Sequence, residues 1–130
     1  MASIKEVIDN LNGLIALKPA TCESIKFAEE ELKLSFSEEY KLYLESYGAI
    51  IAEGVELTGI AKSEHRSVVK VTSLNWELNK QVPKNMYVIE DTHVDGIVIW
   101  QDESGVIYKT MPNNEPQKIN ESLADFLSNK

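Results

Sequence analysis

The stretch from Ile25 to Gly48, IKFAEEELKLSFSEEYKLYLESYG, decides the fold expected for this chain. Its apolar residues recur at three- and four-residue spacing, which predicts two short amphipathic helices joined by a tight connection. Ser35 and Glu38 have the spacing of a capping box, so we expect Ser35 to begin the second helix. Gly48 follows the last periodic residue, where a left-handed residue ends a helix at little cost.

Upstream of this stretch, two further helix starts are predicted. Ser3 and Glu6 form another capping box, which opens a helix whose apolar face runs from Ile4 to Ile15. Thr21 is the expected N-cap of the helix that contains Ile25. The three predicted helices should pack through their apolar faces, with Leu32, Tyr40 and Leu44 buried between the second and third.

Downstream of Gly48 the pattern changes to short strands. Residues 61–67 are polar and predict a loop, and we favour a helix over 72–79, although Val69 and Val71 would also suit a strand. Asn120 is the expected N-cap of a closing helix with Leu123, Phe126 and Leu127 on its apolar face. Strands are expected at 49–52, 54–57, 86–90, 97–101, 106–110 and 117–119.

These elements predict an α+β fold. Successive hairpins give an antiparallel β-sheet of about four to six strands, flanked by N-terminal helices and a C-terminal helix. At 130 residues the chain is long enough for one core, so we expect one domain over residues 1–130.

The order of signals resembles the SMI1/KNR4 family, also called SUKH domains. Ile25, Glu29 and Leu32 are followed by a turn, by Tyr40 and by an apolar stripe that ends at Gly48. The family usually has Leu-Pro at the start of the second helix, where this chain has Phe36-Ser37. Further segments resemble the family's strand-turn-strand tail: Pro83, Met86-Tyr-Val-Ile-Glu90, Asp95-Gly96-Ile-Val-Ile-Trp100 and Gly105-Val-Ile-Tyr108.

The resemblance covers roughly residues 21–127, and it implies a binding protein. Such domains are mostly bacterial immunity proteins that neutralise a toxin, and some eukaryotic relatives are regulatory or scaffold modules. We therefore expect a cognate toxin, such as a nuclease, as the partner. The alternative is a module that binds endogenous proteins, and a small hydrolase or transferase ranks third.

The expected location is the cytoplasm. No run approaches the ~18 apolar residues that a membrane span needs. The first residues lack the basic-then-apolar layout of a secretion signal. Cys22 is the single cysteine and cannot form an internal disulfide, which fits a reducing compartment.

Net charge is −8, and the acid is concentrated in two segments. Glu23 to Glu56 holds nine acidic residues and three lysines, a local −6, and Glu90 to Glu103 holds five acidic residues without Lys or Arg. Arg66 is the only arginine, so direct nucleic-acid binding, which depends on phosphate contacts, is disfavoured. An acidic surface suits a basic protein partner, although it also serves solubility.

Catalytic signatures are sparse. His65 and His93 lack neighbours at metal-binding spacing, and no phosphate-binding or nucleophile motif occurs. The cluster of Glu90, Asp91, His93 and Asp95 could hold a divalent metal, but Asp is an ordinary turn residue and a solvated hairpin loop is favoured. We therefore predict no catalytic residue, no cofactor and no metal site.

One aromatic residue departs from the core pattern. At 100° per residue, Phe27 points almost opposite to Ile25, on the side that also holds Glu23, Glu30 and Glu31. An apolar anchor with a charged rim is typical of a hot spot for a basic partner, unless another element covers Phe27. The candidate partner-binding residues are Glu23, Phe27, Glu30, Glu31, Asp91, Asp95, Asp102 and Glu103.

Overall fold

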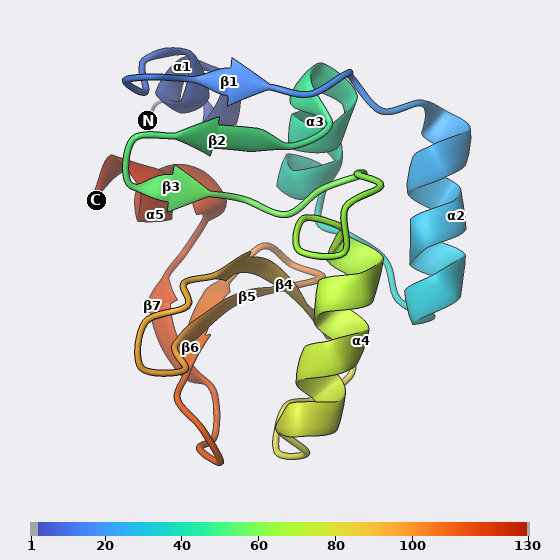
Figure 1. Cartoon of the computed structure of the whole chain (residues 1–130), viewed down its shortest axis with the longest axis vertical. Coiled ribbons are helices and arrows are strands. Elements are labelled where there is room, and N and C mark those ends of the chain that lie inside the picture. Colours follow the sequence, from blue (N-terminus) through green and yellow to red (C-terminus); the bar gives the residue numbers. More distant parts are fainter. Residues whose placement is uncertain (1–2, 130) are drawn as a thin grey trace.

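The computed structural model describes residues 3–129, in which the chain forms five helices and seven strands (Figure 1). The helices are α1 (Ile4–Asp9), α2 (Cys22–Leu32), α3 (Glu38–Tyr47), α4 (Val68–Leu78) and α5 (Leu123–Ser128). The strands are β1 (Ile15–Ala16), β2 (Ile50–Ala52), β3 (Val55–Glu56), β4 (Met86–Asp91), β5 (Val98–Asp102), β6 (Ile107–Thr110) and β7 (Gln117–Asn120). The expected α+β class is confirmed.

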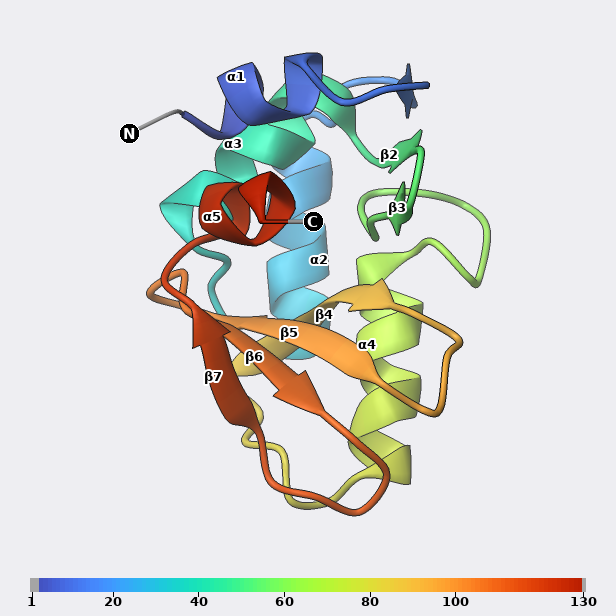
Figure 2. The same cartoon turned by 90° about the vertical axis from the view of Figure 1, so that its left-hand side faces the viewer.

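The strands form two antiparallel sheets, with the orders β1-β2-β3 and β4-β5-β6-β7. In the larger sheet, side chains alternate between two packing surfaces. Val88 and Trp100 pack with Val71 of α4, whereas Tyr87 and Ile99 belong to the core shared with the other helices. Figure 2 shows α4 against the four-stranded sheet and α5 beyond its end.

The two sheets meet at Thr58, just after β3. The Thr58 N–H donates to the carbonyl of Ile89 (2.9 Å), and the Thr58 hydroxyl donates to the carbonyl of Val88 (2.7 Å). The register of β4 shifts between Val88 and Glu90, and such a bulge bends a strand. Thr58 therefore attaches the small sheet to β4 where β4 departs from regular pairing.

Helix α3 brings two tyrosines to this junction. Tyr40 Oη lies 2.9 Å from Thr58 Oγ1, and Tyr43 Oη donates to the Thr58 carbonyl (2.8 Å). Because the Thr58 hydroxyl gives its proton to Val88, Tyr40 is the donor in its pair. Burial raises the pKa of both tyrosines well above the usual range, so both hydroxyls stay protonated and able to donate.

Helix α3 begins at Glu38, because its N-cap is Ser37 and not the predicted Ser35. Ser37 Oγ accepts the N–H of Tyr40 (3.0 Å). Carboxylates from elsewhere in the fold hold the preceding N–H groups: Glu103 accepts from Ser35 (2.7 Å) and Glu29 accepts from Phe36 (2.8 Å). These contacts occupy the backbone donors ahead of Ser37, and the capping-box spacing at Ser35 could not reveal them.

Gly48 ends α3 as predicted, with φ of 74°. A Cβ at this position would lie 2.1 Å from the carbonyl oxygen of Lys18, so only glycine fits. The helix start predicted at Ser3 is confirmed, since the Ser3 side chain accepts from the Glu6 N–H (3.2 Å).

Helix α1 is shorter than the apolar spacing predicts, and the extension to Ile15 is wrong. The helix ends at Asp9, and Ile15 pairs with Ile51 in the small sheet. The Glu53 N–H also donates to the carbonyl of Asn12 (2.8 Å). Pairing with a distant strand therefore overrides the local helical periodicity.

Two other helix starts also differ from the sequence prediction. Helix α4 begins at Val68, with Ser67 as N-cap, because a buried face of Val68, Val71 and Thr72 extends the helix toward the loop. Helix α5 is capped by Ser122, whose Oγ accepts from Asp125 (3.0 Å), whereas the predicted cap Asn120 ends β7.

A carboxylate of α3 anchors the start of α5. Glu39 accepts from the N–H groups of Leu123 (2.7 Å) and Ala124 (3.0 Å), and also from the Gln101 side chain of β5 (2.9 Å). One side chain thus joins two helices and the larger sheet.

The buried face of α3 yields a stability prediction. Leu44 has no exposed surface, and Leu44→Ala should lower the free energy of unfolding by about 2–5 kcal/mol, since it leaves a cavity. Leu42→Ala on the same helix is the control, because Leu42 is 41% exposed and its loss should cost less than about 1 kcal/mol. Both values come from urea titrations, and equal costs would contradict this helix packing.

Candidate protein-binding site

Helix α2 forms an outer layer at one side of the molecule (Figure 1). Thr21 begins it as predicted: Thr21 Oγ1 accepts the Ser24 N–H, and Ser24 Oγ accepts the Thr21 N–H, both at 3.1 Å. Ile25, Ala28 and Leu32 are buried on the inner face. The cap and this apolar stripe together fix which side of α2 faces outward.

Phe27 lies on the outward side, with 63% of its surface exposed. No described element covers its ring, so the alternative of a second-layer core residue does not hold for residues 3–129. Glu23, Glu30 and Glu31 are exposed on the same helix. Across Cys22–Leu32, four glutamates and one lysine give a net charge of −3. We call Phe27 with Glu23, Glu30 and Glu31 the α2 face.

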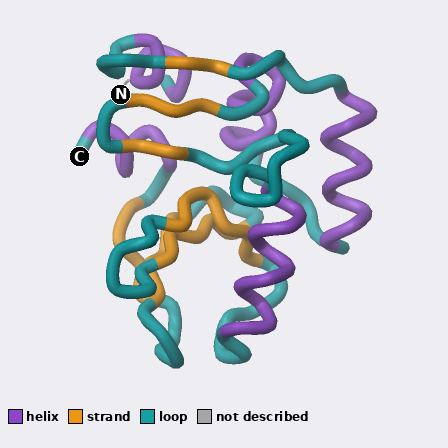
Figure 3. Tube along the Cα trace, in the orientation of Figure 1, coloured by secondary structure: helices purple, strands orange, loops and turns teal. Residues whose placement is uncertain are grey.

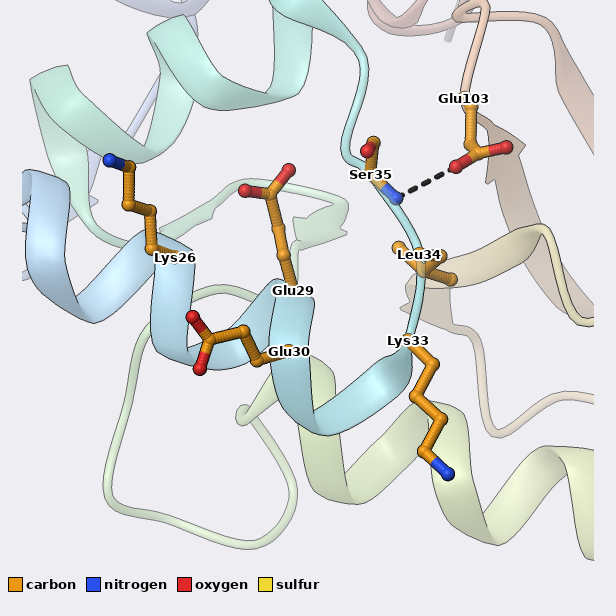
Figure 4. Close-up of a pocket in the computed structure, with 7 residues that line it drawn as sticks. All are labelled: Lys26, Glu29, Glu30, Lys33, Leu34, Ser35 and Glu103. Carbon is orange, nitrogen blue, oxygen red and sulfur yellow. Dashed lines mark hydrogen bonds between the residues drawn. The ribbon is translucent and has the colours of Figure 1, made fainter.

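The fold also places Glu103 close to α2 (Figure 4). A shallow hollow lies between the second half of α2 and the β5–β6 turn, and the Glu103 carboxylate holds the Ser35 N–H at its edge. Lys26 and Lys33 line the same hollow as Glu29 and Glu30, so the charge there is mixed. Glu103 therefore borders the α2 face while also fixing the α2–α3 connection.

Asp102 serves the turn that precedes β6. Its Oδ1 accepts from the N–H groups of Ser104 (2.9 Å), Gly105 (2.9 Å) and Val106 (3.0 Å), and its Oδ2 accepts from the Tyr108 hydroxyl (3.0 Å). Burial alone would raise the pKa of Asp102, but hydrogen bonds from Ser104, Tyr108 and the backbone outweigh it and lower the pKa. The carboxylate thus has a structural role apart from any partner.

Asp91 and Asp95 lie away from the α2 face. Asp91 ends β4 and Asp95 lies within the β4–β5 turn, which is on the side of the molecule opposite α2 in Figure 1. Asp91 accepts the His93 N–H (3.2 Å), and Asp95 has φ of 54° within the exposed turn. Glu103 and Glu30 therefore line one hollow, whereas the β4–β5 turn lies apart from α2.

Sequence reasoning missed the residues that face α2 from the β3–α4 loop (teal in Figure 3) and the first turn of α4. Ile60, Ala61, Val69 and Lys70 border a groove beside Phe27. These residues follow Phe27 in the chain by more than thirty positions. Only the packing of α2 against α4 brings them together, so no local pattern could identify them.

Within residues 3–129, no group of three or more His, Cys, Asp or Glu side chains is placed to hold a metal ion. The described helices also include none that is long and apolar enough to span a membrane. The predicted solvated loop fits His93 and Asp95, which are exposed, but it is wrong for Glu90, which is buried and accepts the Glu56 N–H (2.9 Å).

Comparison with protein families agrees with this architecture. A family model described as SMI1-KNR4 cell-wall (SUKH_5) matches residues 3–130. Because the match spans nearly the whole chain, the protein belongs to the SMI1/KNR4, or SUKH, family. Members of this family are generally non-catalytic binding proteins, commonly immunity proteins. A search of curated proteins finds no significant match to the chain.

The lowered pKa of Asp102 predicts a pH effect on stability. The pKa of the Asp102 carboxyl is lower in the folded state than its ordinary value of 3.8. At a pH above 3.8 the ionised carboxylate therefore stabilises the fold, and this stabilisation is lost as the pH falls through the folded-state pKa. Asp102→Asn keeps an oxygen acceptor but cannot ionise. The stability difference between wild type and variant, from urea titrations, should shrink between neutral pH and pH of about 2. A difference independent of pH would contradict this role.

Proposed function

We propose that this protein is an immunity protein, which binds a cognate bacterial toxin and neutralises it by direct protein–protein contact. Family membership supports a binding protein. The observation that supports a binding site on α2 is the exposure of Phe27, an aromatic side chain 63% exposed on a helix with a net charge of −3. Large aromatic anchors with a charged rim are the usual source of affinity in such interfaces.

The proposed mechanism is steric and electrostatic. The α2 face lies over a cationic substrate cleft of the toxin, such as that of a nuclease, and excludes the substrate. Unlike charges increase the rate of encounter, and the overall charge of −8 acts in the same direction. Partner-binding roles for Glu103, Asp91, Asp95 and Asp102 are secondary proposals, and Asp102 also holds its turn.

A second function is an intracellular regulatory or scaffold module that binds endogenous proteins. Membership of the SMI1/KNR4 family supports this function as well, because some eukaryotic relatives are regulatory or scaffold modules. Gene neighbourhood separates the two functions, because an immunity gene lies beside a toxin gene.

Either function implies a protein without catalysis of its own. We expect the purified protein to carry no stoichiometric transition metal by elemental analysis and to hydrolyse no nucleic acid, peptide or ester substrate. Activity that is lost on chelation and restored by metal would overturn this assignment.

The α2 face predicts separable effects on binding kinetics with the toxin domain encoded beside the gene. Glu30→Lys with Glu31→Lys should slow association and weaken its dependence on salt, since exposed charges mainly steer encounter. Phe27→Ala should speed dissociation about 30-fold, as expected for a hot spot worth about 2 kcal/mol. Surface plasmon resonance at two salt concentrations measures both rates.

Matched variants away from the α2 face serve as controls, one for the change in charge and one for the loss of an apolar side chain. Glu53→Lys with Glu115→Lys makes the same charge change away from α2, and Leu78→Ala removes an apolar side chain that is 66% exposed on α4. The charge control should change the association rate and its salt dependence less than the α2 variant does, and the apolar control should keep the dissociation rate close to wild type. Wild-type kinetics for both α2 variants would exclude this face, and the loops from Glu90 to Glu103 would be tested next.

A further inference from the structure

A groove of about 390 Å³ runs beside Phe27, between α2 and the segment that leads into α4. Its apolar lining comes from both sides: Phe27 and Ala28 of α2, Ile60 and Ala61 of the β3–α4 loop, and Val69 of α4. This volume lies in the range of sites that hold a small organic group. The exposed ring of Phe27 is therefore one wall of an apolar groove.

Small residues are part of the groove lining and leave it room. Ala28 is 2% exposed and carries only a methyl group, and Ala61 lines the groove from the loop. Gly59 is packed so closely that a Cβ would lie 1.9 Å from the carbonyl oxygen of Gly48. The backbone beneath the groove is thus held by the end of α3, and the groove is part of the fold.

The two walls of the groove differ in charge. Glu31 lines the α2 wall, with Glu30 next to it on the same helix. Lys70 lines the opposite wall in the first turn of α4, where the N-terminal end of the helix dipole is also positive. A cationic group is therefore favoured over the α2 wall and disfavoured over the α4 wall.

We propose that this groove binds one large apolar side chain of the protein partner, carried beside a Lys or Arg that pairs with Glu31. The proposal rests on the proposed function, because it names the chemistry that the α2 face recognises. Phe27 contacts the apolar side chain, the carboxylates hold the cation, and Lys70 fixes the orientation in which the two enter.

Three small molecules with the same ring test the groove without the toxin. Indole is neutral, tryptamine is a cation and indole-3-acetate is an anion. In ¹H–¹⁵N correlation spectra, each is titrated to concentrations on the order of millimolar, the affinity range of such small ligands. The amide shifts should centre on Phe27, Ala28, Ala61 and Val69.

Tryptamine should bind about two- to five-fold more tightly than indole, which is the gain that an exposed ion pair provides, and indole-3-acetate should bind least. Glu31→Gln should remove the advantage of tryptamine while leaving indole unchanged. Equal affinity for the anion and the cation would overturn the role of Glu31. An absence of groove shifts with all three molecules would overturn the groove itself.

Ala61→Trp fills the groove from the partly exposed loop, and Leu78→Trp adds the same side chain to an exposed site on α4. Circular dichroism tests whether both variants are folded. Ala61→Trp should abolish the indole shifts and raise the toxin Kd at least ~10-fold, while Leu78→Trp should do neither. If Ala61→Trp does not fold, Phe27→Ala removes one wall of the groove, and the test is then whether the indole shifts are lost; retained shifts would overturn the groove.

The outcomes separate this inference from the proposed function. Wild-type affinity of the Ala61→Trp variant for the toxin would overturn the groove as the binding site and leave the immunity function standing. Failure of the wild-type protein to bind the toxin would overturn the immunity function, and with it the toxin as the groove's occupant.

Discussion

The structure depends on one buried junction, where every polar group of Thr58 is hydrogen-bonded to β4 or to α3. Its N–H and hydroxyl bind β4, and its carbonyl and hydroxyl receive the hydroxyls of Tyr43 and Tyr40. A buried polar group left without a partner costs more free energy than a formed hydrogen bond contributes. The loss of any one of these contacts would therefore be strongly unfavourable. They determine where α3 lies across the two sheets, and α3 in turn supports α2. The position of the proposed binding face therefore follows from contacts in the centre of the core.

The acidic character of the chain has two separate physical uses. Some carboxylates accept backbone N–H groups and hold connections: Glu29, Glu39, Glu90, Asp102 and Glu103. Others project from α2 into solvent, where they add to the field that a partner meets: Glu23, Glu30 and Glu31. Net charge does not distinguish these groups, because a carboxylate that caps a loop counts the same as one that faces solvent. Assigning function from charge density in sequence therefore overestimates the surface available for binding.

Several helix ends set by local chemistry could be predicted from sequence, although the local caps at Ser67 and Ser122 were missed, and contacts between distant segments could not be predicted. Thr21, Ser3 and Gly48 act through neighbouring backbone, so their patterns identified the helix ends correctly. Ser35 looked like a cap, yet Glu103, sixty-eight positions away, occupies its N–H. The outward direction of Phe27 follows from helical geometry alone, whereas the groove beside it requires the packing of α2 on α4.

The separation of inner and outer positions on α2 has a consequence for how recognition can change over generations. Ile25, Ala28 and Leu32 carry the packing, while Glu23, Phe27, Glu30 and Glu31 are exposed and add little to stability. Substitutions at exposed helix positions usually alter stability by less than about 0.5 kcal/mol. Residues that select a partner can therefore be exchanged one at a time without passing through unfolded intermediates. A single fold of this kind can therefore adapt to a partner whose surface changes, because the residues for specificity and those for folding occupy different positions of the same eleven-residue helix.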